Sequence, residues 1–155
     1  MSAVASDEGL DAKSALERFL AGESSGLADV DAERLFLVGA LNYQHSRFAD
    51  AAEMFRALVL ARPRSVRAWA SLAMCHDAVE DFDRAASLYT IALCAPVDEG
   101  YRERATIYLS RTLYWLEQYG RAAEQLDAVG EVELVPELED LRTELRALLD
   151  ARGAS

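Results

Sequence analysis

Few side chains of this sequence could carry chemistry. It has two histidines, His45 and His76, and two cysteines, Cys75 and Cys94. A histidine between a serine and a carboxylate can activate a nucleophile, but no motif supports such an arrangement around either histidine. We therefore expect His45 in an exposed turn and His76 at the edge of the core. The cysteines match no metal or redox spacing, which predicts small core residues in a reducing compartment.

Carboxylates and glycines indicate no ligand site either. The sequence contains neither the G-x-x-x-x-G-K-S/T loop nor the G-x-G-x-x-G turn that cradle phosphates. The pair Asp81 and Asp83 is typical of a turn and a helix N-cap rather than of a calcium loop. We expect no enzymatic activity, no metal and no cofactor, so that function would rest on the recognition of another protein.

Net charge narrows the class of partner. The 155 residues include 16 lysines and arginines against 27 aspartates and glutamates, a formal charge of −11. This excess of acid disfavours nucleic acid and anionic membrane surfaces as partners. Hydrophobic residues make up 52% of the chain, too many for a disordered protein. Since neither a secretory signal nor an apolar run of membrane length is evident, we expect a cytoplasmic protein.

An internal repeat organises the sequence. An aromatic residue followed three positions later by an Ala-Ala pair occurs at Phe48, Phe82 and Tyr119, which are 34 and 37 residues apart. A period of 34 residues is that of tetratricopeptide repeats, which are pairs of antiparallel helices. The three extra residues fall near 95–100. The repeats then begin at Ala32, Val66 and Glu103.

Each position of this frame has a physical role. The eighth and twentieth positions are small because the two helices of a repeat cross closely there. The twenty-fourth is large and apolar and fills the space between helices. The members of these three sets are Gly39, Ala73 and Ser110; Ala51, Ala85 and Ala122; and Phe55, Tyr89 and Leu126.

The predicted fold is all-α. Three tetratricopeptide-type helix pairs, at about 32–65, 66–99 and 103–130, form a short right-handed solenoid with flanking helices, and the repeat domain spans 31–152. Residues 1–9 are expected to be disordered, and 10–30 to hold an N-terminal helix and a linker. Leu16, Phe19 and Leu20 give that helix an apolar face, which would either cap repeat one or form a dimerisation arm.

A C-terminal helix is predicted at about 136–151. Pro136 suits a first helical turn, and five leucines recur at spacings of three and four, namely Leu138, Leu141, Leu145, Leu148 and Leu149. A solenoid needs a terminal cap with one wet face. We expect a capping helix, with a partner-binding coiled coil as the alternative.

The first helix of each repeat is expected to line a concave wall that binds a peptide. Aromatic residues and arginines are typical anchors of interfaces, and small Ala40 and Ala70 would leave room for partner side chains. This wall would carry three arginines, Arg67, Arg104 and Arg111, against two acidic residues, Glu33 and Asp77. The excess of acidic residues is therefore expected on the outer faces and ends of the protein. The predicted peptide-binding residues are Phe36, Ala40, Tyr43, Arg67, Ala70, Met74, Asp77, Arg104, Ile107, Arg111 and Tyr114.

Repeat one resembles a known family. Asn42-Tyr43-Gln44, Asp50-Ala51 and Phe55-Arg56-Ala57-Leu58, with Phe19-Leu20 upstream and Asp81-Phe82-Asp83-Arg84-Ala85-Ala86-Ser87-Leu88-Tyr89 in repeat two, are similar to the class II chaperones of type III secretion. The resemblance covers roughly residues 16–150. The order of an N-terminal helix, three repeats and a C-terminal helix also fits.

The resemblance implies a cytoplasmic bacterial chaperone. Such a protein binds an extended segment near the N-terminus of a hydrophobic translocator in its groove and keeps the translocator soluble for export. The family's groove aromatics fall on Phe36 and Tyr43, whereas Ala40 departs from the aromatic residue frequent at the matching position. The resemblance also implies a homodimer formed through the region around Leu16, Phe19 and Leu20. The alternative function is a general scaffold or assembly adaptor.

Overall fold

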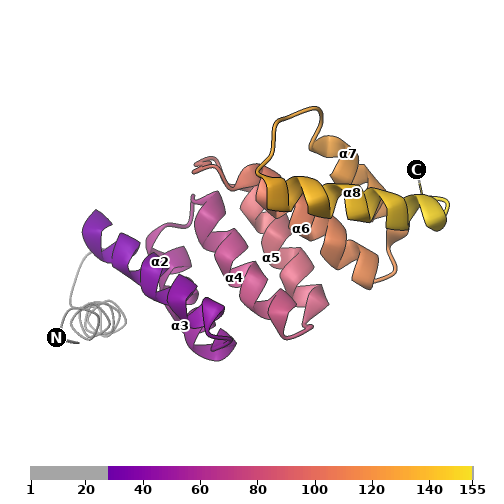
Figure 1. Cartoon of the computed structure of the whole chain (residues 1–155). Helices are drawn as coiled ribbons and strands as arrows, with labels where there is room; N and C mark the ends of the chain where they lie inside the picture. The colour runs from indigo at the N-terminus through magenta and orange to yellow at the C-terminus, as the bar shows by residue number, and fades with distance from the viewer. Residues whose placement is uncertain (1–27, 155) are drawn as a thin grey trace. The chain divides into compact units, whose positions relative to one another are not determined.

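A computed structural model describes residues 28–154 (Figure 1). These residues form seven α-helices and no β-strand, which confirms the all-α prediction. The described part of the chain contains no helix long and apolar enough to cross a membrane. The N-terminal helix expected around Leu16, Phe19 and Leu20 lies outside the described residues.

The chain divides into two compact units, the first ending at Arg64 and the second beginning at Ser65. Within residues 28–154, unit one contains one helix pair, and unit two contains two helix pairs and a last helix. The bounds are α2 (Asp29–Gln44) and α3 (Phe48–Ala61) in unit one, and α4 (Val66–Ala78), α5 (Phe82–Cys94), α6 (Arg102–Trp115), α7 (Tyr119–Ala128) and α8 (Pro136–Ala151) in unit two. The second helix of each pair begins at the aromatic residue that the repeat predicted.

The turn inside each helix pair has the same backbone conformation. Ser46, Glu80 and Glu117 follow the first helices with φ of 60°, 62° and 60°, in the left-handed region that ends many helices. In each turn the next residue's amide donates to a carbonyl five residues earlier, as Arg47 does to Asn42 at 2.8 Å. These bonds satisfy carbonyls that the helix end leaves without partners. The repeat therefore extends to the geometry of its turns.

Close helix crossing inside each pair follows the predicted small residues. In unit one a Cβ on Gly39 would lie 2.6 Å from Cε1 of Phe55, so α2 and α3 approach at a residue that has no side chain. In unit two the hydroxyl of Ser110 donates to the carbonyl of Ala122 at 2.8 Å, which satisfies both groups where they are buried. Phe55, Tyr89 and Leu126 are all buried, as the frame predicted.

The loop that contains the three extra residues is fixed by polar contacts. Asp98 Oδ1 accepts hydrogen bonds from the amides of Gly100, Tyr101 and Arg102 at 3.0–3.2 Å, and so caps the start of α6. The guanidinium of Arg102 donates to the carbonyls of Leu93 and Ala95, both at 2.9 Å, at the end of α5. One side chain therefore ties the end of one helix pair to the start of the next.

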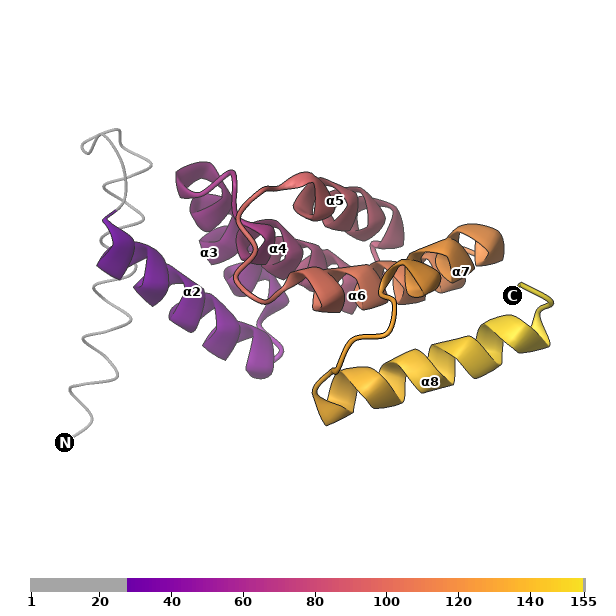
Figure 2. The same ribbon diagram turned by 90° about the horizontal axis from the view of Figure 1, so that it is seen from above.

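Helix α8 packs along α6 and α7 (Figures 1 and 2). Leu138, Leu145 and Leu149 are buried against them, which is the arrangement expected of a cap. Leu148 was predicted on the same face but is 36% exposed. Likewise Cys75 is buried as expected, whereas Cys94 is exposed because it is the last residue of α5 and points away from the core.

Candidate functional site

The predicted binding face of unit one lies on α2. Phe36, Ala40 and Tyr43 recur at spacings of four and three, so they share one side of the helix, and all three are half-buried. The ring of Phe36 lies 6.1 Å from that of Phe55, and the ring of Tyr43 meets Phe48 edge-on at 5.2 Å. Each aromatic is therefore held by a ring of α3, with the small Ala40 between them.

Unit two supplies the predicted residues of α4 and α6. Ala70 and Ile107 are 1% and 0% exposed and belong to the core of this unit, so they offer no surface to a ligand. Met74 and Tyr114 pack against that core and remain partly exposed. The spacing of the first helices placed all four on one face, but only tertiary packing separates core from wall.

Two of the three predicted wall arginines are neutralised within unit two. Nε of Arg67 lies 3.3 Å from a carboxylate oxygen of Glu99, which also accepts the hydroxyl of Ser65. Arg111 donates to Asp77 at 3.1 Å. Arg104 has no carboxylate partner within the described residues, and its guanidinium lies 5.5 Å from the ring centre of Tyr101. Of the three arginines predicted to line the wall, one therefore has no ion-pair partner within residues 28–154.

Asp77 is the centre of a buried polar cluster that the sequence did not predict. Its carboxylate is 8% exposed and accepts hydrogen bonds from Arg111, from the hydroxyl of Tyr89 at 3.4 Å and from that of Thr112 at 3.3 Å. A buried carboxylate needs such partners. The signal in the sequence was its position, the twelfth, where the other repeats carry Tyr43 and Tyr114.

The two histidines lie in different surroundings within the described part of the chain. His45 is exposed in its turn, while Nδ1 of His76 lies 3.2 Å from Asp81, which is also 3.8 Å from Arg84. Asp81 occupies the N-cap position of α5 but makes no capping hydrogen bond with its side chain. In the described range no three His, Cys, Asp or Glu side chains gather closely enough to hold a metal ion.

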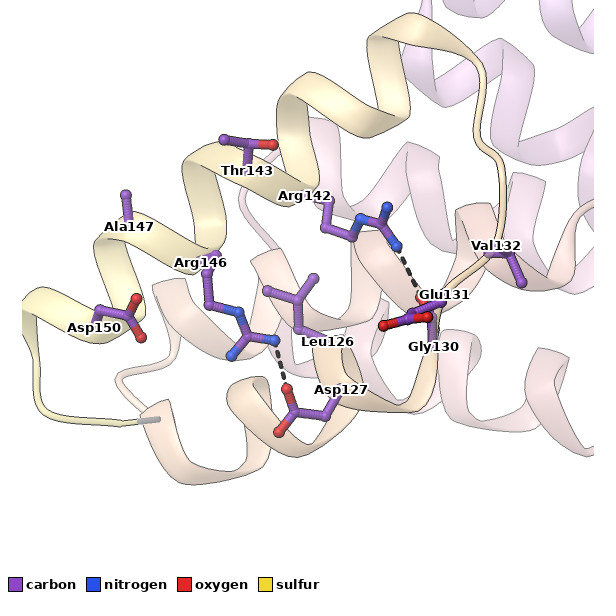
Figure 3. Close-up of a pocket in the computed structure, with 10 residues that line it drawn as sticks. All are labelled: Leu126, Asp127, Gly130, Glu131, Val132, Arg142, Thr143, Arg146, Ala147 and Asp150. Carbon is purple, nitrogen blue, oxygen red and sulfur yellow. Dashed lines mark hydrogen bonds and ion pairs between the residues drawn. The ribbon is translucent and has the colours of Figure 1, made fainter.

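A cleft of about 840 Å³ lies between α7, α8 and the loop that joins them (Figure 3). Leu126 is one of the residues that line it, and two arginines of α8 extend from that helix toward α7 and the loop (Figure 3). Arg142 donates to the carbonyl of Gly130 at 2.9 Å and to Glu139 at 2.6 Å, and Arg146 binds Asp127. Both guanidiniums are used to hold the capping helix in place. We therefore interpret this cleft as part of the packing of α8 and not as a ligand site.

Comparisons with solved structures identify the fold. The chaperone SycD of Yersinia enterocolitica, bound to a peptide of the translocator YopD, superposes with a TM-score of 0.69 at 20% identity, over 80% of this chain and 93% of that one. PcrH, a protein of Pseudomonas aeruginosa, bound to the chaperone-binding region of PopD, gives 0.69 at 21%, over 81% and 93%. The TPR2B domain of yeast Sti1, in its pHsp70 complex, gives a TM-score of 0.65 at 20% identity, over 76% of this chain and 97% of that one.

These likenesses establish a tetratricopeptide-type helical fold. No protein-family model matches the sequence. No curated protein matches it either. The resemblance to translocator chaperones that the sequence showed is thus matched by solved structures at the level of the fold.

Proposed function

We propose that this protein is a bacterial cytoplasmic chaperone of type III secretion, without enzymatic activity. It binds an extended segment of a hydrophobic translocator and keeps that translocator soluble and competent for export. The observation that carries the proposal is the face of α2, where Phe36 and Tyr43 are fixed by Phe55 and Phe48 on either side of Ala40. The similarity in fold between this chain and the chaperones of the SycD–YopD and PcrH–PopD complexes supports the proposal.

The chemistry of this face suits an extended apolar segment. Two aromatic rings held by neighbouring rings lose little conformational entropy on binding, and aromatic residues supply much of the binding energy of interfaces. Ala40 has a small side chain between these two aromatics in the sequence, and we propose that one apolar side chain of the partner packs beside it. In unit two, Met74 and Tyr114 give further apolar contact, and Arg104 is the cation available for a carboxylate of the bound segment.

The net charge of −11 suits the same role. A translocator exposes apolar surface in water, and a strongly charged chaperone keeps the complex soluble. We also propose the homodimer that the resemblance implies, formed through Leu16, Phe19 and Leu20.

The test is co-expression with the hydrophobic translocator of the same organism, followed by titration of a peptide from its N-terminal region. Phe36→Ala with Tyr43→Ala should weaken binding at least 30-fold, since each truncated anchor costs about 1–2 kcal/mol or more. Leu60→Ala is the matched control, because Leu60 is 62% exposed on α3 of the same unit. If the double variant keeps its helical content and binds like the unaltered protein, the α2 face is not the site.

A scaffold that holds a folded partner is the second candidate. The likeness to the TPR2B domain of yeast Sti1 in its pHsp70 complex, at a TM-score of 0.65, favours it because that fold also serves proteins other than the secretion chaperones. Limited proteolysis of the bound partner separates the two functions. One protected extended segment in an otherwise digested partner supports the chaperone, whereas a partner that stays folded and resistant supports the scaffold.

A further inference from the structure

An exposed tryptophan lies at one edge of unit two, outside its buried core and outside the proposed binding face. Trp115, the last residue of α6, is 56% exposed. The repeat places Gln44 and Ala78 at the equivalent positions of the other two pairs, so the helix pair itself requires no large side chain there. A tryptophan at this position therefore occurs only in the third repeat of the three. An exposed tryptophan is typical of an interaction surface.

The indole ring is held in place from two sides. Phe82, the first residue of α5, stacks on it with ring centres 6.5 Å apart and planes at 18°. Tyr114 meets it nearly edge-on at 5.5 Å, and Tyr114 in turn packs on Tyr119 at 5.3 Å. The hydroxyl of Tyr114 interacts with Arg152, which raises the pKa of that guanidinium. A ring fixed in this way presents its remaining surface at low entropic cost.

The side chains around the ring are apolar and mostly acidic, with two cations nearby: Arg84, next to Asp83, lies 3.8 Å from Asp81, and Arg152 interacts with Tyr114 and Glu117. The stacking of Phe82 on Trp115 brings the turn that follows α4 close to the end of α6, and each of these helices ends with the negative pole of its dipole. Val79, in the turn that follows α4, is 58% exposed. We name the following residues, all of them exposed or half-exposed, the tryptophan surface: Val79, Glu80, Phe82, Asp83, Trp115 and Glu117.

We propose that the tryptophan surface is a docking site for a protein segment that carries arginine or lysine next to aliphatic residues. A cation stacked on the face of an indole ring is stabilised by its π electrons, and tryptophan is the best aromatic partner for this contact. Glu80, Asp83 and Glu117 supply the complementary charge, and Val79 supplies apolar contact. None of the six residues of this surface is among those proposed to bind the translocator segment, although Tyr114, which is, contacts the ring of Trp115.

The experiment uses the whole chain and two defined peptides. One is a labelled nine-residue peptide of alternating leucine and arginine, and the other has citrulline, the uncharged analogue, at each arginine. The protein should bind the arginine peptide about 3- to 30-fold more tightly, the range expected for one cation–π contact. In a Trp69→Phe background, Trp115 is the one remaining tryptophan, and its fluorescence should change on binding.

Trp115→Gln, which installs the residue of repeat one, should reduce binding of the arginine peptide to the level of the citrulline peptide. Glu117→Lys should reduce it too, whereas Glu133→Lys, on the exposed loop before α8, should have little effect. Equal binding of the two peptides, or unchanged binding by Trp115→Gln, overturns the proposal. So does sedimentation that shows a dimer lost in Trp115→Gln, because a second copy of the chain would then occupy this surface.

Discussion

Gly39 offers a sharp test of how closely the two helices of unit one pack. An added Cβ would lie 2.6 Å from Cε1 and 2.8 Å from Cζ of Phe55, where carbon atoms in proteins keep about 3.5 Å or more. The Phe55 ring is 3% exposed and rests on Phe36 at 6.1 Å, so it has little room to move. Gly39→Ala must therefore displace a core ring or part the helices.

The magnitude follows from two opposed contributions. Alanine in place of glycine inside a helix stabilises by about 1 kcal/mol. Overpacking a well-filled core costs about 1–3 kcal/mol. With the cost near the middle of that range, Gly39→Ala should lower the free energy of unfolding by about 1 kcal/mol and the melting temperature by about 3 °C.

Gly120 is the matched control. It lies in α7, and nothing lies within 4 Å of the Cβ that an alanine would add. Gly120→Ala should therefore stabilise the protein by about 0.5–1 kcal/mol. The same chemical change thus has opposite signs at two helical glycines, which urea unfolding followed by circular dichroism can measure.

A double variant isolates the cause. In a Phe55→Leu background the ring atoms that meet the new Cβ are gone, so Gly39→Ala should become stabilising by about 1 kcal/mol. If Gly39→Ala stabilises the unaltered protein as much as Gly120→Ala does, the close crossing of α2 and α3 is not as described. If the Phe55→Leu background leaves its effect unchanged, the ring is not what opposes the methyl group.

Three further predictions concern unit two, each measured as the free energy of unfolding against the unaltered protein. Glu117→Gly should stabilise by about 0.5–1 kcal/mol, because a left-handed residue other than glycine is strained; a loss would contradict the turn geometry. Arg102→Ala should cost about 2 kcal/mol through its two lost bonds to carbonyls at the end of α5, and a neutral result would refute that clamp. Asp77→Ala should lower the free energy of unfolding by about 2–3 kcal/mol. A double-mutant cycle with Arg111→Ala should show a coupling energy of about 1 kcal/mol or more, and additive losses would show that the two side chains do not form an ion pair.

The repeat made much of the fold predictable from the sequence. The second helices begin at Phe48, Phe82 and Tyr119, and α8 spans Pro136–Ala151, as the patterns indicated. Local rules suffice there, because an aromatic staple, a proline in a first turn and leucines at helical spacing each act within a few residues. The three extra residues near 95–100 lie in the loop between α5 and α6, which the local sequence also predicted.

The candidate site was less predictable, because a helical position defines a face but not its neighbours. Ile107 and Ala70 share a face with Met74 and Arg104, yet they are covered by the core of unit two. Glu99 and Asp77 neutralise two arginines across gaps in sequence of 32 and 34 residues, a pairing that no local pattern records.

The sequence by itself determined the helix pairs, their period and the residues that their close crossings require, since these follow from spacing and side-chain size. Tertiary structure alone decided the burial and the charge of the faces that were predicted to bind a partner. Tertiary packing left Trp115 exposed and stacked on the ring of Phe82. It also paired Arg111 with Asp77 on the wall where the sequence predicted three arginines. Burial and ion pairing depend on side chains that meet only when separate helices pack together.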